Sequence, residues 1–380
     1  MDIFQKAEAL GRAAQYDLCG EACGTAAARV RDNLGRWIYP VALPDGTRVM
    51  LLKVLFTNAC DNDCRYCANR AGRDTPRFTF ECEELARLFD QLWRSKRVTG
   101  LFLSSAVRRG GTQTMERMIT TVEILRNRYQ FRGYIHLKIL PGAEKACVER
   151  AVQLATRVSL NLEAPNSTRL AHLSGAKDFE NDLLIPMRWV HEFRQRGLGA
   201  PAGQTTQFVV GAAGESDREI LTTTDRLYRE VELRRAYFSA FQPIPDTPLE
   251  NQAATSLLRE HRLYQSDYLR RLYGFEFDEL IYDENGNLLQ SEDPKMAWAH
   301  HNPQRFPIEI NRASREELLR IPGIGPRSAR RIIHLRKEAK FRYLEDLTKI
   351  GILANRAAPF ILLDGRRPPY QMHLWDPLSL

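Results

Sequence analysis

The sequence has no long hydrophobic run and few cysteines. No window of its 380 residues approaches eighteen apolar residues without a charge, and residues 1–18 resemble an amphipathic helix rather than the apolar block of a signal peptide. The cysteines number seven and are unevenly spaced, which excludes the disulfide framework of a small secreted protein. We therefore expect a cytoplasmic protein with no membrane partner, whose reduced thiols are available to bind metal.

The sequence also has little surplus charge outside its last fifth. Lys plus Arg number 55 and Asp plus Glu number 47, a formal net charge of +8. Residues 305–380 hold 15 basic and 8 acidic side chains, or +7, and the preceding 304 residues carry only +1. Charge confined to one end of a chain indicates an acidic partner at that end.

Residues 50–250 alternate short apolar runs with segments of helical periodicity. The composition, 43% hydrophobic and 27% charged, is that of an ordinary globular protein, and the length allows about two domains. Repeated strand–helix pairs favour a parallel sheet or barrel, so the predicted fold class is α/β. We expect strands at residues 52–56, 100–104, 134–140, 158–162, 205–210 and 236–241, and helices that include residues 83–96, 114–129, 181–196 and 217–232.

A change of composition near residue 300 predicts a second domain. One more amphipathic helix is expected at residues 255–273, and residues 283–304 then gather Asn, Gly, Asp, Pro and His with little periodicity, as surface connections do. Short basic helices are expected beyond it, at residues 314–320, 327–337 and 344–349. The predicted division is a helical extension at 1–49, a barrel at 50–280, a linker at 281–304 and a small all-α domain at 305–380.

Three cysteines follow the first predicted strand with the spacing CxxxCxxC: Cys60, Cys64 and Cys67. Three thiolates on one loop can hold three irons of a [4Fe-4S] cluster and leave the fourth iron without a protein ligand. The alternative is a zinc site, which needs a fourth ligand. Candidates for that ligand are Cys19, Cys23, Cys82, Cys147 or a histidine.

The cysteine motif, with Tyr66 directly before its third cysteine and a series of βα units behind it, resembles the radical S-adenosylmethionine (SAM) superfamily. The resemblance implies a partial (β/α)6 barrel that binds a [4Fe-4S] cluster and SAM. In that superfamily the methionine end of SAM chelates the open iron, and an electron from the cluster breaks a C–S bond. The resulting 5′-deoxyadenosyl radical removes a hydrogen atom from the substrate. The resemblance identifies no catalytic side chain in this sequence.

The same resemblance implies SAM contacts at the ends of two strands. Ser104 and Ser105 end the second strand, where the family usually has a Gly-Gly-Glu turn that contacts the SAM amino group. The Glu is missing here, so the contact falls to backbone carbonyls or to the two serine hydroxyls. Val210 and Gly211 lie in a segment that resembles the fifth-strand motif against which the adenine lies.

Four polar residues of the predicted strands are further candidates for SAM or substrate binding. Asn161 and Glu163 alternate along the fourth strand and are expected on one face of it. The alternative is a buried hydrogen-bonded pair at the strand end. Lys138 and Gln207 place a charge and an amide inside apolar strands, which is unusual unless such groups are paired.

Residues 318–333 read as a helix, a Pro-Gly-Ile-Gly turn and a second helix, and resemble the helix-hairpin-helix of DNA-binding proteins. Its glycines let the backbone approach a phosphate at the start of the second helix, and arginines add sequence-independent attraction. A second copy near residue 350 has Leu353 at the second glycine position and is expected only to pack against the first. The alternative for this region is a protein-interaction domain. The candidate nucleic-acid-binding residues are Gly323, Ile324, Gly325, Arg327, Ser328, Arg330 and Arg331.

A cysteine loop and a hairpin in one chain resemble a group of radical SAM proteins assigned to DNA modification or repair, typically encoded beside a uracil-DNA glycosylase-like protein. This resemblance implies an enzyme that acts on a base or sugar of DNA, with that glycosylase-like protein as a partner and an unknown electron donor. Two alternatives remain. One is radical SAM modification of RNA, and the other is a non-catalytic iron-sulfur scaffold that binds DNA and recruits a glycosylase.

Overall fold

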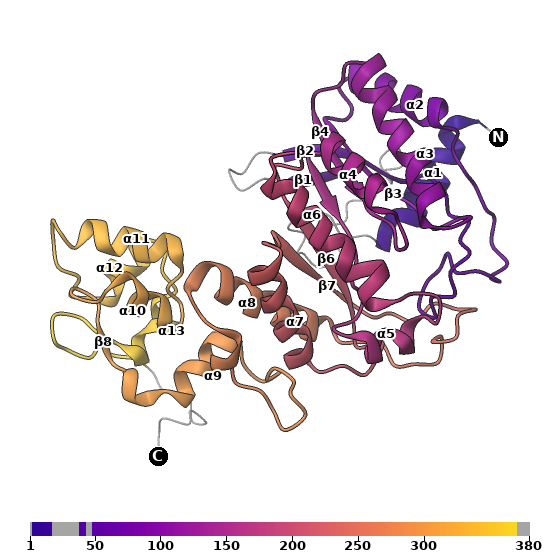
Figure 1. Ribbon diagram of the computed structural model, residues 1–380. Coiled ribbons are helices and arrows are strands. Elements are labelled where there is room, and N and C mark those ends of the chain that lie inside the picture. The colour runs from indigo at the N-terminus through magenta and orange to yellow at the C-terminus, as the bar shows by residue number, and fades with distance from the viewer. Residues whose placement is uncertain (1, 17–37, 43–47, 371–380) are drawn as a thin grey trace. The chain divides into compact units, whose positions relative to one another are not determined.

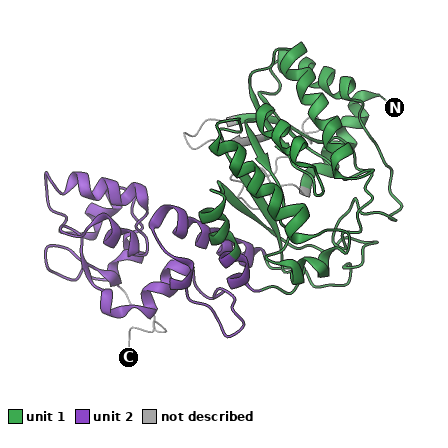
Figure 2. Cartoon of the chain, viewed as in Figure 1, with its two compact units in different colours: residues 1–215, 223–256 green, residues 216–222, 257–380 purple. Residues whose placement is uncertain are grey.

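The computed structural model describes residues 2–16, 38–42 and 48–370, and the chain divides into two units (Figures 1 and 2). One unit comprises residues 1–215 and 223–256, and the other comprises residues 216–222 and 257–380. We call them the barrel unit and the hairpin unit. No helix in the described part of the chain is long and apolar enough to cross a membrane.

The barrel unit contains a seven-stranded sheet whose strands follow the order of the sequence. Strands β2 to β7 are parallel, and β1 pairs with β2 in the antiparallel direction. This confirms the predicted α/β partial barrel and its six strands. The strands are β1 (Ile38–Ala42), β2 (Arg48–Leu55), β3 (Gly100–Ser104), β4 (Tyr134–Lys138), β5 (Arg157–Ser159), β6 (Gln204–Val210) and β7 (Arg235–Ala240).

Two strands differ from the prediction. β1 was not expected because Pro40 interrupts a five-residue run, and an edge strand is where a sheet tolerates proline. β5 ends at Ser159, three residues earlier than predicted, so Asn161 and Glu163 lie beyond the strand rather than on one of its faces. The backbone of Glu163 has φ +65°, and its amide donates to the Gln207 carbonyl, which keeps this segment beside β6.

The two faces of the sheet differ in polarity, because side chains alternate along each strand. One face is apolar, with Leu52, Val54, Leu101 and Leu103 almost fully buried. The helices are α1 (Ile3–Ala13), α2 (Cys82–Arg94), α3 (Gly111–Glu123), α4 (Lys145–Leu154), α5 (Ser167–Leu173), α6 (Ile185–Gln195) and α7 (Asp217–Glu230), with short turns η1 (Ala14–Tyr16), η3 (Ile124–Arg128) and η4 (Phe179–Leu184). Helix α2 packs on α3, α3 on α4, and α4 on α6 (Figure 1). Helix α7 begins in the hairpin unit and ends in the barrel unit.

The hairpin unit consists mainly of short helices. It also contains a two-stranded parallel pair, β8 with β9, whose strands of two residues are too short to show a periodicity in the sequence. Its elements are α8 (Leu257–Tyr268), η5 (Leu269–Tyr273), η6 (Phe277–Glu279), α9 (Pro294–His301), η7 (Pro303–Arg305), β8 (Ile308–Glu309), α10 (Arg315–Arg320), α11 (Pro326–Leu335), α12 (Leu344–Lys349), α13 (Ala354–Ala357), η8 (Ala358–Phe360) and β9 (Ile361–Leu362).

The segment expected as a linker, residues 281–304, contains helix α9. Asp293 caps this helix by accepting hydrogen bonds from the Lys295 and Met296 amides, and Pro294 occupies its first turn. Trp298 is 2% exposed and meets Phe275 edge to face at 5.2 Å. The Arg320 guanidinium of α10 lies 4.9 Å from the Trp298 ring centre. This part of the chain therefore belongs to the core beneath the hairpin.

Candidate metal centre and candidate nucleic-acid interface

The three motif cysteines lie on a loop that begins where β2 ends. Cys64 is buried, and Cys60 and Cys67 are half-buried. The loop starts beside β3, where the Phe56 amide donates to the Ser104 carbonyl at 2.7 Å. Carboxyl ends of parallel strands share one edge of the sheet, and this is where α/β folds bind ligands. The cysteines are therefore positioned at the functional edge of the barrel.

Arg77 holds the cysteine loop together. Its guanidinium donates to the carbonyl of Asn58 at 2.6 Å, of Asn69 at 2.9 Å, of Arg70 at 2.8 Å and of Arg73 at 3.0 Å. Hydrogen bonds from a charged donor are stronger than neutral ones, and four of them on one side chain fix the backbone on both sides of the cysteines. The loop is thus shaped by an arginine outside the motif.

Asp63, inside the motif, joins the cysteine loop to a distant loop. Its carboxylate accepts hydrogen bonds from the Ser174 hydroxyl at 2.6 Å, the Gly175 amide at 3.0 Å and the Ala176 amide at 3.3 Å. Burial opposes ionisation, but these hydrogen bonds outweigh it and lower the pKa of Asp63. The Arg65 amide adds a bond to the Leu173 carbonyl. Residues 173–177 are therefore held against the cysteines.

Lys177, at the end of that distant loop, brings a buried cation to the cysteines. Its ammonium lies 2.8 Å from both carboxylate oxygens of Glu163, and only 5% of its side chain is exposed. It is also hydrogen bonded to Cys64. Burial alone would lower the pKa of Lys177, but Glu163 and Cys64 outweigh that effect and raise it. The ammonium stays charged beside the thiol.

Two of the three thiols hold their protons more tightly than an ordinary cysteine does. Burial raises the pKa of Cys64, and burial together with the Cys64 and Cys60 charges raises the pKa of Cys67 to about 12. Metal binding requires thiolates, so a metal must displace these protons. The Cys67 sulfur already accepts a hydrogen bond from the Asn69 amide at 3.4 Å, a contact that stabilises its thiolate form.

The donor set fits a [4Fe-4S] cluster. Within residues 2–16, 38–42 and 48–370, no three His, Cys, Asp or Glu side chains are arranged to hold one metal ion. In a [4Fe-4S] cluster each thiolate ligates a different iron, so the sulfurs need not converge on one point. Cys82 of α2 donates to the Arg117 carbonyl of α3, and Cys147 is buried on α4. Cys19 and Cys23 lie outside the described residues.

Most of the predicted SAM contacts lie at the carboxyl edge of the sheet, as the cysteine loop does. Ser104 ends β3, and the Ser105 hydroxyl donates to the Ala106 carbonyl at 2.7 Å. Lys138 ends β4, and its ammonium donates to the Asn161 side-chain oxygen at 2.7 Å. Asn161 and Glu163 are therefore each hydrogen bonded to a lysine, one to Lys138 and the other to Lys177.

The remaining predicted SAM contacts lie on β6 and directly after it. Gln207 and Val210 are buried, and Gly211 has φ +89°, a conformation that favours glycine. Its amide donates to the Glu215 carboxylate, which also accepts from the Ala213 amide at 3.1 Å. This carboxylate fixes the turn after β6. The SAM-binding roles of these residues stay predictions.

The six parallel strands of the barrel contain no Asp or Glu, but they contain several cations. Lys53, His136 and Arg157 share one face, because Phe102 pairs in register with both Lys53 and His136, and His136 pairs with Arg157. Burial, with the charges of Arg157, Lys138 and Lys53, holds the pKa of His136 well below its usual value. This face of the described strands is cationic.

The hairpin between α10 and α11 requires its glycines for geometric reasons. Gly323 has φ +85°, and a Cβ at this position would lie 2.7 Å from the Leu353 carbonyl. The second copy of the motif therefore packs against the first, as expected. The hairpin is also supported from below, because the Lys295 ammonium donates to the Ile324 carbonyl at 2.6 Å. A Cβ at Gly325 would lie 3.1 Å from the Tyr273 hydroxyl.

The candidate arginines of α11 differ in what they contact. Arg327 and Arg330 are exposed near the start of the helix, and Ser328 between them is half-buried. Arg331 is exposed as well, but its guanidinium donates to the Ile350 carbonyl at 2.9 Å. It therefore holds the second hairpin copy, and Arg327 and Arg330 are the better candidates for contact with a phosphate.

Sequence reasoning did not identify Arg77, Lys177, Lys295 or Tyr273. Lys177 lies 110 residues after Cys67 and Lys295 lies 29 residues before Ile324, so no local pattern connects them to the motifs. The only local signal was Asp63, a carboxylate inside the cysteine motif. Their contacts arise from tertiary packing.

Known proteins resemble this chain in both units. Residues 54–227 match the Radical SAM superfamily, and residues 305–357 match the family described as helix-hairpin-helix motif. The chain is 26% identical over 197 residues to threonylcarbamoyladenosine tRNA methylthiotransferase MtaB of Thermotoga maritima, a match that covers 50% of this chain and 43% of that protein.

Two solved structures resemble part of the chain. Methylornithine synthase (PylB) aligns with a TM-score of 0.45 at 16% identity and covers 58% of this chain and 62% of that chain. HydG, a maturase of the [FeFe]-hydrogenase, aligns with a TM-score of 0.44 at 10% identity and covers 58% of this chain and 49% of that chain. The chain thus spans about half the length of HydG and less than half the length of MtaB.

The family matches and the cysteine loop agree. Residues 54–227 contain the three cysteines and strands β3 to β6, and residues 305–357 contain both hairpin copies. The predicted enzyme class and its two cofactors, a [4Fe-4S] cluster and SAM, are confirmed at the level of this domain. The chain contains a radical SAM superfamily domain followed by a helix-hairpin-helix motif.

Proposed function

We propose that this protein is a radical SAM enzyme that modifies or repairs a base or sugar of DNA. The observation that carries the proposal is the presence, in one chain, of a cysteine loop suited to a [4Fe-4S] cluster and of a basic helix-hairpin-helix motif. When bound, the cluster and SAM supply one-electron cleavage of SAM and removal of a hydrogen atom from the substrate. A cytoplasmic location is part of the same proposal.

In this proposal the barrel residues hold the cofactors and keep water away. Cys60, Cys64 and Cys67 each ligate one iron, and Lys177 offsets the negative charge of the thiolates. The two serines at the end of β3, and residues in or directly after β4, β5 and β6, contact SAM. The residues assigned to SAM are Ser104, Ser105, Lys138, Asn161, Glu163, Gln207, Val210 and Gly211.

The charge of the barrel strands supports an anionic substrate. Lys53 and Arg157 lie on one face, and the described parallel strands contain no Asp or Glu. A nucleotide brings phosphates that such a face attracts. A stacked base cannot reach a buried cofactor, so the substrate is a single strand or an extruded nucleotide.

The hairpin unit holds the nucleic-acid backbone in this proposal. The amides at the start of α11, near Gly323, Ile324 and Gly325, point toward a phosphate, as helix N-termini do. Arg327, Ser328 and Arg330 add charge and a hydroxyl, and Arg331 contributes through the second hairpin copy. Such contacts grip the backbone without reading the bases. A uracil-DNA glycosylase-like protein is proposed as a partner, and the electron donor is not identified.

RNA is the second candidate substrate, and one observation favours it. The relative MtaB is named as a tRNA methylthiotransferase that acts on threonylcarbamoyladenosine, and it matches half of this chain. A motif that contacts only phosphates also binds RNA. The two candidates share the cluster, SAM and the anionic substrate, and they differ only in the nucleic acid.

The experiment compares matched DNA and RNA single strands with the reconstituted full chain. The protein receives SAM and a chemical reductant under anaerobic conditions, and 5′-deoxyadenosine and the masses of the digested nucleosides are measured. We expect 5′-deoxyadenosine together with a new mass among the deoxynucleosides. A new mass only among the ribonucleosides would mean that the substrate is RNA and not DNA. An intact cluster without SAM cleavage leaves a non-catalytic scaffold and contradicts the proposal.

A further inference from the structure

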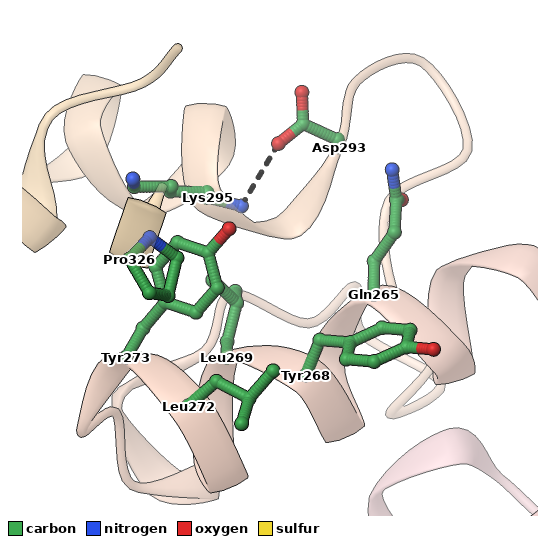
Figure 3. A pocket seen from close by; sticks show the side chains of 8 residues that line it. All are labelled: Gln265, Tyr268, Leu269, Leu272, Tyr273, Asp293, Lys295 and Pro326. Carbon is green, nitrogen blue, oxygen red and sulfur yellow. Dashed lines mark hydrogen bonds between the residues drawn. The ribbon is translucent and has the colours of Figure 1, made fainter. Parts of the chain in front are cut away.

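A pocket of about 290 Å³ opens beside the hairpin, within the hairpin unit (Figure 3). Gln265 and Tyr268 of α8 lie on one side of it in this view, and Tyr273 and Pro326 lie on the other. Its lining is completed by Leu269, Leu272, Asp293 and Lys295. The volume is close to the lower end of the range for pockets that bind small organic groups.

The pocket adjoins the end of α11 that is proposed to hold a phosphate. Pro326, which lines it, is the first residue of this ten-residue helix. Tyr273, on the same wall, places its hydroxyl beside Gly325. The Lys295 side chain runs away from the pocket centre in Figure 3, and its ammonium donates to the Ile324 carbonyl. The hairpin turn and the pocket therefore share a wall.

The surfaces of the pocket suit a flat aromatic group. Two tyrosine rings and a proline ring line it, and Leu272 is 46% exposed at its rim. Aromatic side chains are the usual partners of unstacked bases, because every base has a π-face. A ligand that covers the exposed leucine and the half-buried tyrosines also removes apolar surface from water, which is favourable.

The polar groups of the pocket offer a ligand a hydrogen-bond donor rather than an unpaired negative charge. The Gln265 side-chain oxygen accepts from Arg262 at 2.9 Å, which leaves its amide nitrogen to donate to a ligand. The Asp293 carboxylate caps α9 and is paired with Arg356, so its charge is neutralised. A base edge carries acceptors that an amide donor recognises.

We propose that this pocket binds an unpaired nucleobase of the strand whose phosphate lies at the hairpin. The inference rests on the proposed function and adds a base-binding position to it, since a base can enter the pocket only from a single strand or an unpaired site. The hairpin motif alone predicts backbone contact without base contact. The pocket adds a position at which the presence of a base matters.

The test is an abasic scan with the reconstituted full chain. Fluorescence anisotropy measures binding of a single-stranded DNA oligonucleotide and of copies that lack one base at each position in turn. We expect one position at which loss of the base weakens binding by roughly 5- to 100-fold, the usual effect of losing one stacked base. If the protein binds the intact strand and binds every abasic copy equally well, the pocket does not bind a base.

Variants assign the effect to the pocket. Leu272→Ala and Tyr268→Ala are expected to weaken binding of the intact strand and to leave binding of the sensitive abasic strand unchanged. Tyr268→Phe keeps the ring and is expected to behave as the parent protein does. The matched control is Leu257→Ala, which removes a leucine that is 63% exposed and does not line the pocket. An equal effect of Leu257→Ala contradicts the assignment.

The outcomes separate the pocket from the proposed function. If the full chain binds no oligonucleotide, both fail. If it binds, and if charge reversal at Arg327 and Arg330 abolishes binding while the scan is flat, the hairpin function survives and the pocket does not. The far-UV circular dichroism spectrum serves as the folding control, since cluster absorbance reports only on the barrel unit. A variant that loses helical signal is replaced by Gln265→Ala, for which the same loss of base dependence is expected.

Discussion

The two units build their sites in different ways. In the barrel unit, charged side chains from distant segments hold the cysteine loop: Arg77 binds four carbonyls, Asp63 binds residues 174–176, and Lys177 reaches Cys64. In the hairpin unit the turn itself is short and depends on a positive φ at Gly323 and on close contact with Leu353. The cluster site therefore depends on charged side chains from distant segments, whereas the hairpin depends on backbone conformation and on its contacts with Leu353 and Lys295.

Removal of the motif cysteines has the largest expected effect. Cys60→Ala, Cys64→Ala or Cys67→Ala leaves an iron of the cluster without its thiolate, so the absorbance near roughly 400 nm that is typical of such clusters and all SAM cleavage are expected to disappear. Cys82→Ala is the control, because its thiol donates to the Arg117 carbonyl of α3 and not to the cysteine loop. Retention of both signals in a motif variant contradicts the site.

Charge reversal on α11 tests the hairpin without touching the barrel. Arg327→Glu with Arg330→Glu is expected to weaken oligonucleotide binding by more than about tenfold and to flatten its salt dependence by about one unit of slope per lost phosphate contact. The measurement is the affinity at several salt concentrations. The control is Arg315→Glu, at the far end of α10 from the turn. The cluster is expected to remain.

Full-chain variants are preferable to truncation at residue 305. Residues 257–380 form one unit, in which α9 packs Trp298 beneath α10. A chain that ends at residue 304 would expose Trp298 and lose the partner of Lys295, so weaker binding would not identify the phosphate contacts. A normal salt slope in the arginine variants would show instead that the hairpin does not carry the affinity.

Loss of Arg77 is expected to have a smaller effect on the same cluster loop. Arg77→Met removes four hydrogen bonds from a charged donor, and we expect it to cost about 2–4 kcal/mol of local stability and to lower the iron content after reconstitution several-fold. The matched control is Arg87→Met, an exposed arginine of α2. Equal iron content in the two variants would mean that the loop holds its shape without the arginine.

The smallest expected effect concerns pH and the support of the hairpin. Burial lowers the pKa of Lys295 to about 7, whereas the unfolded chain keeps a value near 10.5. Between these values the unfolded state binds the additional proton, so stability of the hairpin unit rises from pH 7 toward pH 10. Hydrogen exchange of the α11 amides in the full chain measures this. Lys295→Met is expected to flatten the rise, and an unchanged pH profile in that variant would remove Lys295 from the account.

The sequence predicted what depends on local pattern. Periodicity located the six parallel strands, and cysteine and glycine spacing located both motifs. The sequence did not predict β1, because Pro40 argues against a strand anywhere but at the edge of a sheet. It did not predict α9 either, because Pro294 and a short apolar run resemble a connecting segment. It also placed Asn161 and Glu163 on a strand that ends earlier. Arg77 and Lys177 were beyond reach, since their role follows only from which loops meet in space.

The central claim is that the cysteine loop binds a [4Fe-4S] cluster with one iron open to SAM. The most direct measurement is the electron paramagnetic resonance spectrum of the chemically reduced, reconstituted full chain before and after SAM is added. The account predicts a [4Fe-4S] signal that changes on addition of SAM, because a new ligand alters the electronic structure of the iron it binds. A signal that SAM leaves unchanged, or a protein that holds no cluster, would contradict the account.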